Sequence, residues 1–590
     1  MNPTDTTRPD YFHQVVDCQW ACPAHTPVPE YLRLIAQGRY AESYEINWWS
    51  NVFPGILGRV CDRPCEPACR RGRVDEEPVA ICRMKRVAAD LKGDISSLLP
   101  KANPEKNGKR IACVGAGPAS LTVARDLALL GYQVTVFDGG TQAGGMMRSQ
   151  IPKFRLPDEV IDEECGYVAA LDVDIRLNSW ISSLSDLRGQ GWDAIFVGTG
   201  APRGRDADLP GRQEAAAKIH IGIDWLSNLA FEHVSSVGKR VIVLGGGNTA
   251  MDCCRSARRL GAEEVRVIVR SGFDEMKASP WEKEEALHEG IIIQNCMVPM
   301  EFTHEGGTLT GVVFEHVEVQ YDAKGKRALV PTGRMEHVPC DEVLIAIGQE
   351  NSFPWIERDI GLEFDRWDMP VLNEKTLQSS IPDIFFGGDS ALGPKNIITA
   401  VAQGHDAAIS IDLFCKGQDV VADRPDDRIT LASQKMGIHE WAYANEISED
   451  DRQKVAVRDL AVALKDVRLE LELGFDIEKA CAEAERCLNC DMATVFNSST
   501  CIECDSCVDI CPTECITFTD DGDEPDLRGR LKAPAPNLEQ ELYVASGLKT
   551  GRVMVKDENI CLHCGLCSER CPTNAWDMQK VDWLVAHAGA

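Results

Sequence analysis

Eight cysteines near the C-terminus fall into two copies of one spacing, C-x2-C-x2-C-x3-C-P, and this repeat constrains the chain more than any other feature. The first copy is Cys501, Cys504, Cys507 and Cys511, followed by Pro512, and the second is Cys561, Cys564, Cys567 and Cys571, followed by Pro572. This spacing is typical of thiolates that hold [4Fe–4S] clusters. A single run would also suit a structural zinc site, but two runs that each end in Cys-Pro leave that alternative weak.

The repeat resembles the ligand runs of bacterial two-cluster ferredoxins, in which the fourth cysteine of each run reaches across to the other cluster. The resemblance implies one cluster on Cys501, Cys504, Cys507 and Cys571 and a second on Cys511, Cys561, Cys564 and Cys567. We therefore expect an α+β ferredoxin domain over residues 496–580 that carries single electrons.

The size, cysteine content and charge of the chain indicate what broad class of protein it belongs to. Its 590 residues leave room for several domains. Twenty-five cysteines would fit a secreted disulfide scaffold, but the length and an N-terminus without a basic or apolar leader favour a reduced, cytoplasmic protein. A formal charge of −30 disfavours nucleic acid and anionic lipid as partners. No apolar run is long enough to span a membrane.

Residues 108–138 have the pattern of a dinucleotide-binding unit. An apolar strand runs into a glycine-rich turn, a helix follows, and a second strand ends in an acid about twenty residues on. The glycines let a pyrophosphate approach the backbone at the helix N-terminus. The candidate residues are Gly115, Gly117, Pro118, Ala119, Ser120 and Asp138, with Ser120 in place of the third glycine.

Residues 238–270 repeat this design with one difference. The turn is Gly245, Gly246, Gly247, Asn248 and Thr249. The second strand ends in Arg270, with Lys277 nearby, where the first unit has an acid. An acid there favours a free ribose, whereas a basic residue accommodates a 2′-phosphate. We therefore expect FAD at the first unit and NADP(H) at the second. NAD remains an alternative, because Arg270 and Lys277 would also suit a solvated surface.

A third piece follows the second unit. Two apolar strands, 342–348 and 383–390, precede a helix, and Gly388 with Asp389 ends the second strand, where a flavin's ribityl chain and phosphate could be held. The predicted fold is α/β multidomain, with two Rossmann-like domains, the nicotinamide domain being inserted in the FAD domain. The expected boundaries are 108–237 and 343–420 for the FAD domain and 238–342 for the insert.

Residues 1–420 resemble the small (β) subunit of bacterial glutamate synthase, and related modules of dihydropyrimidine dehydrogenase and of NADH-dependent ferredoxin:NADP oxidoreductase. The resemblance rests on GAGPAS, AGGMMRSQIPKFRLP (143–157), GGGNTAMD and GGDSALGPKNIITAVAQG. It implies FAD at the first unit and the GGD loop, and NADPH at the insert. It adds Gly144, Gly145, Arg155 and Asn396 to the candidate cofactor-binding residues.

The resemblance also implies a helical two-cluster domain over residues 1–100, with Cys18, Cys22, Cys61, Cys65, Cys69 and Cys82. Relatives begin this domain with an EAxRCLxC segment, which here occurs at 483–491, inside a segment (421–495) expected to be a helical linker. We expect Cys487 and Cys490 to fold back and join Cys18 and Cys69 at one cluster. The second would take Cys22, Cys61, Cys65 and a fourth ligand, for which Cys82 is our choice although relatives use a non-cysteine side chain. Alternatively, Cys487 and Cys490 are core thiols without metal.

Together these features predict an enzyme that exchanges electrons between NAD(P)(H), FAD and up to four [4Fe–4S] clusters, with no catalytic side chain of its own. The appended ferredoxin domain favours a partner such as a thiamine-diphosphate 2-oxoacid (2-oxoglutarate) oxidoreductase. The alternatives are a freestanding ferredoxin:NADP oxidoreductase that uses soluble ferredoxin, a glutamate synthase small subunit, and a non-enzymatic Fe–S scaffold or redox sensor. Residues 519–550, an acidic insertion between the two cysteine runs, are expected to be disordered or to contact a partner.

Overall fold

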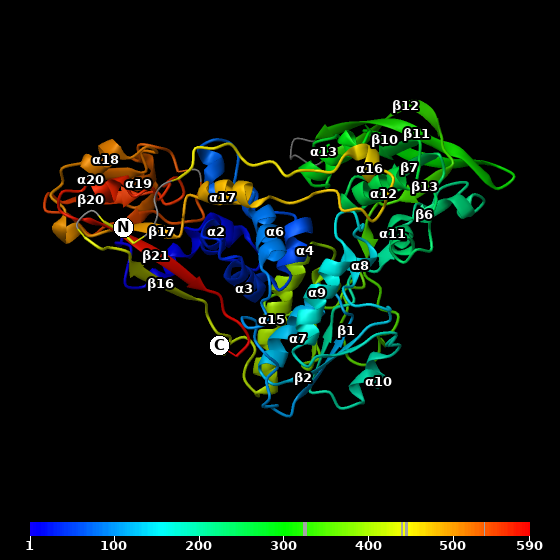
Figure 1. Ribbon diagram of the computed structural model, residues 1–590, viewed down its shortest axis with the longest axis horizontal. Coiled ribbons are helices and arrows are strands. Elements are labelled where there is room, and N and C mark those ends of the chain that lie inside the picture. Colours follow the sequence, from blue (N-terminus) through cyan, green and yellow to red (C-terminus); the bar gives the residue numbers. More distant parts are fainter. Residues whose placement is uncertain (322–326, 438–439, 443–446, 536, 590) are drawn as a thin grey trace.

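The computed structural model describes residues 1–321, 327–437, 440–442, 447–535 and 537–589. A central group of N-terminal helices joins three lobes (Figure 1). One lobe holds both cysteine runs, the second holds the 238–270 unit and the third holds the 108–138 unit. Among the described residues, no helix is long and apolar enough to cross a membrane.

The flavin lobe is built on a five-stranded parallel sheet in the order β15-β4-β1-β2-β3. Its strands are β1 (Arg110–Val114), β2 (Gln133–Phe137), β3 (Asp174–Arg176), β4 (Ala194–Val197) and β15 (Ile384–Phe386). Its helices are α7 (Pro118–Leu129), α8 (Met146–Ser149), α9 (Asp158–Ala169), α10 (Leu184–Arg188), α14 (Asp389–Leu392) and α15 (Ile397–Cys415). The central strands are apolar and buried, as expected for a parallel sheet covered on both faces. The chain completes this sheet only when it returns as β15 beside β4.

The nicotinamide lobe has a second five-stranded parallel sheet, in the order β6-β13-β7-β8-β9. The strands are β6 (Ile219–Ile221), β7 (Arg240–Leu244), β8 (Glu264–Ile268), β9 (Ile292–Gln294) and β13 (Glu342–Ile345). The helices are η3 (Ala216–Lys218), α11 (Gly222–Ala230), α12 (Asn248–Arg259) and α13 (Pro280–His288). An antiparallel sheet of β10 (Met297–Glu305), β11 (Thr308–Tyr321) and β12 (Arg327–Pro339) packs beside it.

The insert is longer than the sequence suggested. β5 (Arg203–Gly204) and β14 (Gln349–Glu350) pair as a two-stranded ribbon where the chain leaves and re-enters the flavin lobe. Both β6 and β13 belong to the nicotinamide sheet, so the predicted boundaries at 238 and 342 cut through it. β6 has only three residues, too few to give a periodic signal.

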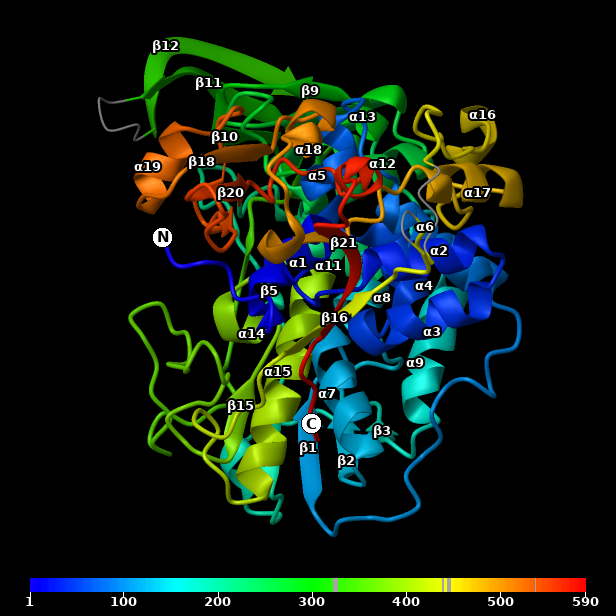
Figure 2. The same cartoon turned by 90° about the vertical axis from the view of Figure 1, so that its left-hand side faces the viewer.

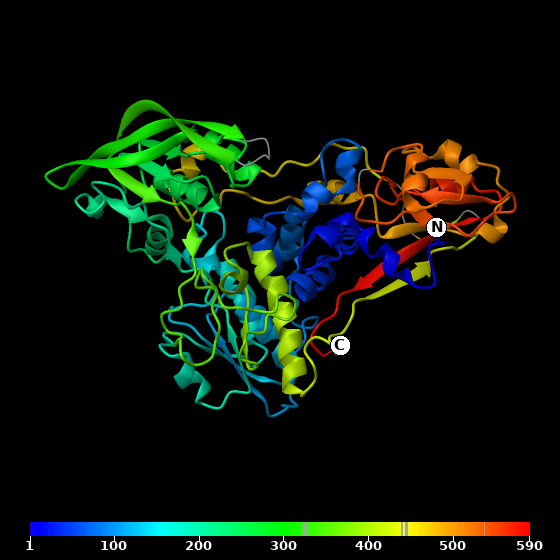
Figure 3. The same cartoon turned by 180° about the vertical axis from the view of Figure 1, so that it is seen from behind.

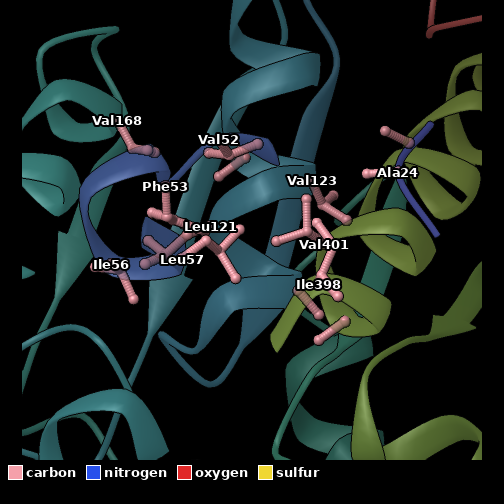
Figure 4. Packing of buried hydrophobic residues seen from close by; sticks show 14 of the residues in the cluster. Ala24, Val52, Phe53, Ile56, Leu57, Leu121, Val123, Val168, Ile398 and Val401 are labelled. Carbon is pink, nitrogen blue, oxygen red and sulfur yellow. The ribbon is translucent and has the colours of Figure 1, made fainter. Parts of the chain in front are cut away.

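The N-terminal helices are η1 (Pro9–Gln14), α1 (Asp17–Ala21), α2 (Val28–Ala36), α3 (Tyr40–Asn51), α4 (Pro54–Val60), α5 (Cys65–Ala68), η2 (Arg70–Arg73) and α6 (Ile81–Leu91). They share one hydrophobic core with the flavin lobe. Figure 4 shows Phe53 of this group near Val168 of α9, and Leu57 near Leu121 of α7. The N-terminal helices therefore pack directly against the flavin lobe.

The ferredoxin lobe contains two three-stranded sheets. One is β16 (Arg428–Ser433), β21 (Trp576–Leu584) and β17 (Met492–Phe496), and the other is β18 (Ile516–Asp520), β20 (Arg552–Lys556) and β19 (Tyr543–Val544). Its helices are η4 (Ser498–Thr500), α18 (Ser506–Ile510), α19 (Glu524–Gly529) and α20 (Leu566–Arg570). The first residues of the chain also pack here, because Phe12 and Val15 are buried in its core. The end of the chain runs back to the flavin lobe, where the Gly589 amide donates to Asp412 of α15 at 3.2 Å (Figure 2).

Two expectations for the C-terminal half need correction. The described part of insertion 519–550 is folded, with α19 and β19 around a small apolar core that contains Leu527 and Leu542, so disorder is the wrong alternative and contact with a partner stays a prediction. The segment 421–495 is mostly extended and crosses to the nicotinamide lobe and back (Figure 3). In its described residues, α-helix is limited to α16 (Leu460–Ala463) and α17 (Ile477–Glu485). The backbone of this segment hydrogen-bonds directly to other parts of the chain, and the Leu471 amide, for example, donates to the Phe154 carbonyl at 2.9 Å. These bonds satisfy backbone groups that a helix would otherwise pair internally.

Candidate functional site

The predicted flavin-binding loop lies between β1 and α7 in a close backbone arrangement. Gly115 has a φ of 96°, and a Cβ there would lie 2.6 Å from the Gly198 carbonyl oxygen. A Cβ on Gly145 would lie 2.8 Å from Cα of Gly117, so the backbone at residue 145 packs directly against this loop. Asp138 accepts hydrogen bonds from the backbone amides of Ala116 (2.7 Å) and Gly140 (2.6 Å). Asp138, at the end of β2, therefore stabilises the backbone of the predicted flavin-binding loop through these hydrogen bonds.

Buried polar atoms without partners surround this loop. Oγ1 of Thr199, Oδ1 of Asn351 and Oε1 of Gln403 are buried and unpaired in the described structure. Asn351 donates to the Asp389 carbonyl at 2.8 Å, which places it at the GGD loop. Gly388 has a φ of 64°, and a Cβ there would lie 3.2 Å from Cβ of Ala119, at the start of α7. Orphaned polar atoms next to a helix N-terminus and glycine loops fit a polar, phosphate-bearing ligand such as FAD.

The glycine turn of the nicotinamide lobe has a first position that only glycine fits and a third position that is open. Gly245 has a φ of 131°, and its Cβ would lie 2.1 Å from the Ala346 carbonyl oxygen. A Cβ on Gly247 would meet no atom within 4 Å, so the start of α12 is open to an approaching group. Arg270 and Lys277 are both exposed beyond the end of β8. The turn thus leaves space where a pyrophosphate could approach the helix N-terminus.

One acid that the sequence analysis missed joins the predicted sites. Asp62 directly follows Cys61, and its Oδ1 accepts a hydrogen bond from Asn248 Nδ2 at 3.3 Å. Burial raises the pKa of Asp62, and a hydrogen bond from Asn396 opposes that rise. Asn396 also caps α15 by accepting from the Thr399 amide at 3.0 Å. A cysteine loop, the nicotinamide turn and the flavin-lobe helix therefore meet at Asp62, and no sequence motif marks it.

Arg155 was predicted to line the flavin, but the structure gives its guanidinium other partners. It pairs with Asp252 of α12 at 2.6 Å and with Glu282 of α13. Both carboxylates are buried and lie in the nicotinamide lobe. Arg155 therefore ties the two lobes together in this structure, and a contact with the flavin stays a prediction.

The structure brings Cys18, Cys69, Cys487 and Cys490 together, and we call them the bridging set. Burial raises the pKa of the Cys18 thiol, and the nearby Cys69, Cys490 and Cys487 raise it further. Burial raises the pKa of Cys487 to about 12. Cys487 follows the end of α17, so the EAERCLNC segment does lie against the N-terminal helices. Whether the set holds a cluster remains a prediction.

Cys22, Cys61, Cys65 and Cys82 form a second group, the flavin-side set, named for the Asp62 contact. The Cys82 thiol lies close enough to those of Cys61 and Cys65 to perturb the pKa of both. Lys85 lies one turn further along α6 and is buried. Burial alone would lower the pKa of Lys85, but the nearby Cys61, Cys82 and Cys65 raise it above its usual value. A buried cation beside four thiols fits a site that carries negative charge.

The last cysteine of each ferredoxin run lies beside the other run, which is the arrangement that the ferredoxin resemblance implies. Cys501 is close to Cys571 and Cys504, and Cys507 is close to Cys501 and Cys571. We call Cys501, Cys504, Cys507 and Cys571 the outer ferredoxin set, because Cys504 is exposed. Cys511, Cys561, Cys564 and Cys567 line one small cavity and form the inner ferredoxin set.

Cys515, which belongs to neither cysteine run, lines the same cavity. Its Sγ lies 3.4 Å from Sγ of Cys511, and its hydrogen bond lowers the pKa of Cys511 to about 5. The only sequence signal was its place four residues after Cys511, where the second run has Ala575.

Comparison with known proteins agrees with this arrangement. Residues 109–404 match the pyridine nucleotide-disulphide oxidoreductase family. Residues 13–95 match dihydropyrimidine dehydrogenase domain II, 4Fe-4S cluster, and residues 500–575 match the 4Fe-4S dicluster domain. These matches confirm the predicted fold class and the predicted classes of cofactor.

Three relatives share more than one of these parts. The chain is 36% identical to the NADP(+)-dependent formate dehydrogenase subunit beta of Moorella thermoacetica, over 80% of this chain and 70% of that protein. It is 31% identical to the NADPH-Fe(3+) oxidoreductase subunit beta of Geobacter sulfurreducens, over 82% of this chain and 77% of that protein. It is 32% identical to the glutamate synthase [NADPH] small chain of Escherichia coli, over 67% and 87%. The chain therefore belongs to the pyridine nucleotide-disulphide oxidoreductase family, as a member that also carries two 4Fe-4S domains.

Proposed function

We propose that this protein is an NADP(H)-linked electron-transfer subunit that connects a nicotinamide to a partner enzyme through FAD and four iron–sulfur clusters. Flavin accepts two electrons from a hydride donor and releases them one at a time, and [4Fe–4S] clusters carry single electrons. The proposal is supported mainly by the position of Asp62. It lies between the nicotinamide turn, the flavin-lobe helix and the flavin-side set, so the three predicted sites share one junction.

The role of the chain's own residues in this function is to bind and to position. The open space at Gly247 would admit a pyrophosphate to the N-terminus of α12. Arg270 and Lys277, exposed beyond β8, would accept a 2′-phosphate and so favour NADP(H) over NAD. The four thiol sets would hold one cluster each, with Lys85 offsetting negative charge at the flavin-side set.

The partner is proposed from the relatives' names and from the ferredoxin lobe. The two relatives first described are named as beta subunits, one of a formate dehydrogenase and one of an Fe(3+) oxidoreductase. By analogy, we propose that this chain also exchanges electrons with a separate catalytic subunit. A formate-oxidising subunit is the first candidate to test. The 2-oxoacid oxidoreductase favoured by sequence reasoning has no support from these names and becomes the second to test.

The decisive experiment is an anaerobic purification from the native cell at low salt, with identification and assay of the chains that co-purify. Reduction of NADP+ by formate, or by a 2-oxoacid with coenzyme A, in the presence of the co-purified subunit would support the subunit assignment and identify the substrate. A chain that elutes alone and exchanges electrons between NADPH and soluble ferredoxin would be a freestanding reductase instead. A chain that neither binds FAD nor oxidises NADPH would refute the function.

A further inference from the structure

A buried arginine connects the bridging set to the ferredoxin lobe. Arg70 directly follows Cys69 and is 1% exposed. Its Nη1 donates to the carbonyl oxygen of Cys561 at 2.5 Å, and its Nε donates to the carboxylate of Asp17, which precedes Cys18. One guanidinium therefore holds a backbone atom of an inner ferredoxin cysteine beside two loops of the bridging set.

A buried histidine makes the same connection from the other side. His563 lies between Cys561 and Cys564 and is 2% exposed. Its Nε2 lies 3.0 Å from Nη1 of Arg70, and its Nδ1 lies 2.7 Å from the carbonyl oxygen of Cys490. Because a carbonyl oxygen only accepts, the Nδ1–H donates to Cys490, whereas Nε2 faces both the Arg70 guanidinium and the Glu558 carboxylate. The imidazole thus spans from a cysteine of the bridging set to the loop of the inner ferredoxin set.

The first cysteine run makes no equivalent contact in the described structure. Glu503 occupies the position of His563 in that run, and both residues have left-handed backbones, with φ of 57° and 55°. The Glu503 carboxylate instead accepts from Thr550 and Arg552, within the ferredoxin lobe. The residue type at this position therefore distinguishes the two runs, and His563 is the one that faces the N-terminal helices.

We propose that Arg70 and His563 form the electron crossing between the bridging set and the inner ferredoxin set. This inference rests on the proposed function and adds an order: flavin-side set, bridging set, inner ferredoxin set, outer ferredoxin set, partner. With clusters bound to both sets, each crossing would oxidise the donor by one electron and reduce the acceptor by one, so the two electrons of a hydride would supply two crossings. No bond or proton changes at Arg70 or His563. They are positioning residues, which fix the two ligand loops against each other through hydrogen bonds.

The outer ferredoxin set is then the exit to the partner. It contains Cys504, which is exposed, and it is flanked by Ile502, which is 56% exposed. The inner set lies against Arg70, which donates to the Cys561 carbonyl, and its His563 lies 3.2 Å from Oε2 of the buried Glu558. Because the inner set makes these contacts toward the N-terminal helices, we place the outer set last in the order.

The test uses the full chain with its cofactors and three variants. His563→Ala removes the bridge. His563→Asn keeps an amide near the position of Nδ1, and asparagine tolerates the left-handed backbone. Glu503→Ala is the matched control, at the same position of the other run. Each protein is mixed with limiting NADPH and freeze-quenched for electron paramagnetic resonance, with the ferredoxin-lobe signals assigned from a Cys504→Ser chain. Flavin bleaching and iron content are measured in parallel.

We expect His563→Ala to keep its iron and its rate of flavin bleaching, while its ferredoxin-lobe signals rise about tenfold more slowly, equivalent to about 1.4 kcal/mol of barrier. His563→Asn should recover most of that rate, and Glu503→Ala should match the wild type. Equal rates in His563→Ala and wild type would overturn the crossing. Iron loss in His563→Ala but not in Glu503→Ala would also overturn it, by assigning His563 to cluster assembly. If NADPH fails to bleach the flavin in the wild type, the proposed function itself fails.

Discussion

Glu164 offers a quantitative test of how the N-terminal helices are fixed to the flavin lobe. Its carboxylate lies at the N-terminus of α4 and accepts from the amides of Gly55 (2.6 Å) and Ile56 (3.0 Å) and from the Tyr44 hydroxyl (2.8 Å). Despite these donors, burial raises the pKa of Glu164 to about 7. The substitution Glu164→Gln keeps the shape of the side chain and removes its titration.

The expected magnitude follows from the difference in pKa between the folded and unfolded states. The ordinary glutamate value is 4.5, and the folded pKa is about 7. Between these values the unfolded chain has released the proton and the folded chain still binds it, so a rise in pH favours unfolding. A difference of about 2.5 units corresponds to about 3 kcal/mol at 1.36 kcal/mol per unit. This contribution to stability is present below about pH 4.5 and is lost as pH rises through about 7.

Two measurements test this reasoning. Hydrogen exchange at the amides of α4 is compared between wild type and Glu164→Gln at each pH, so that the intrinsic pH dependence cancels. We expect the free energy of local opening in wild type, relative to the variant, to fall by about 3 kcal/mol from pH 4.5 to 7 and then to level off. An infrared band of the protonated carboxyl group should disappear near pH 7 in wild type only. A relative stability that rises with pH would show that the three donors outweigh burial, and would refute the reasoning.

Three further predictions concern the predicted sites. Gly247→Ala should fold and keep its iron, because the new Cβ meets no protein atom within 4 Å, but should bind NADPH roughly tenfold more weakly in an equilibrium titration; unchanged affinity would place the nucleotide elsewhere. Cys82→Ser should lose about four iron atoms per chain in a metal analysis, whereas Cys165→Ser, a buried thiol outside the four sets, should lose none. Equal iron in both would remove Cys82 from the ligands. Arg155→Gln leaves Asp252 buried without its 2.6 Å partner, which should cost about 3 kcal/mol and speed hydrogen exchange in α12; unchanged exchange would contradict the role of this pair between the lobes.

The sequence alone determined the local units of this protein. Cysteine spacing predicted two runs of cluster ligands, because three thiolates within seven residues can face one cluster, and the ferredoxin resemblance implied that the fourth cysteines cross. Strand, glycine turn and helix identified both nucleotide units, because a tight turn with φ near 96° or 131° at Gly115 and Gly245 requires glycine locally. These motifs depend only on residues that are neighbours in the sequence, so they can be recognised without knowledge of the fold.

The tertiary structure alone decided how the units are joined. The three-residue strand β6 carries no pattern, yet its pairing with β13 sets the true limits of the nicotinamide lobe. Asp62, Arg70 and His563 are ordinary polar residues in the sequence, and their importance comes from partners as distant as Cys561 and Cys490. Contacts between residues hundreds of positions apart depend on how whole lobes pack, and a local sequence pattern does not specify that packing.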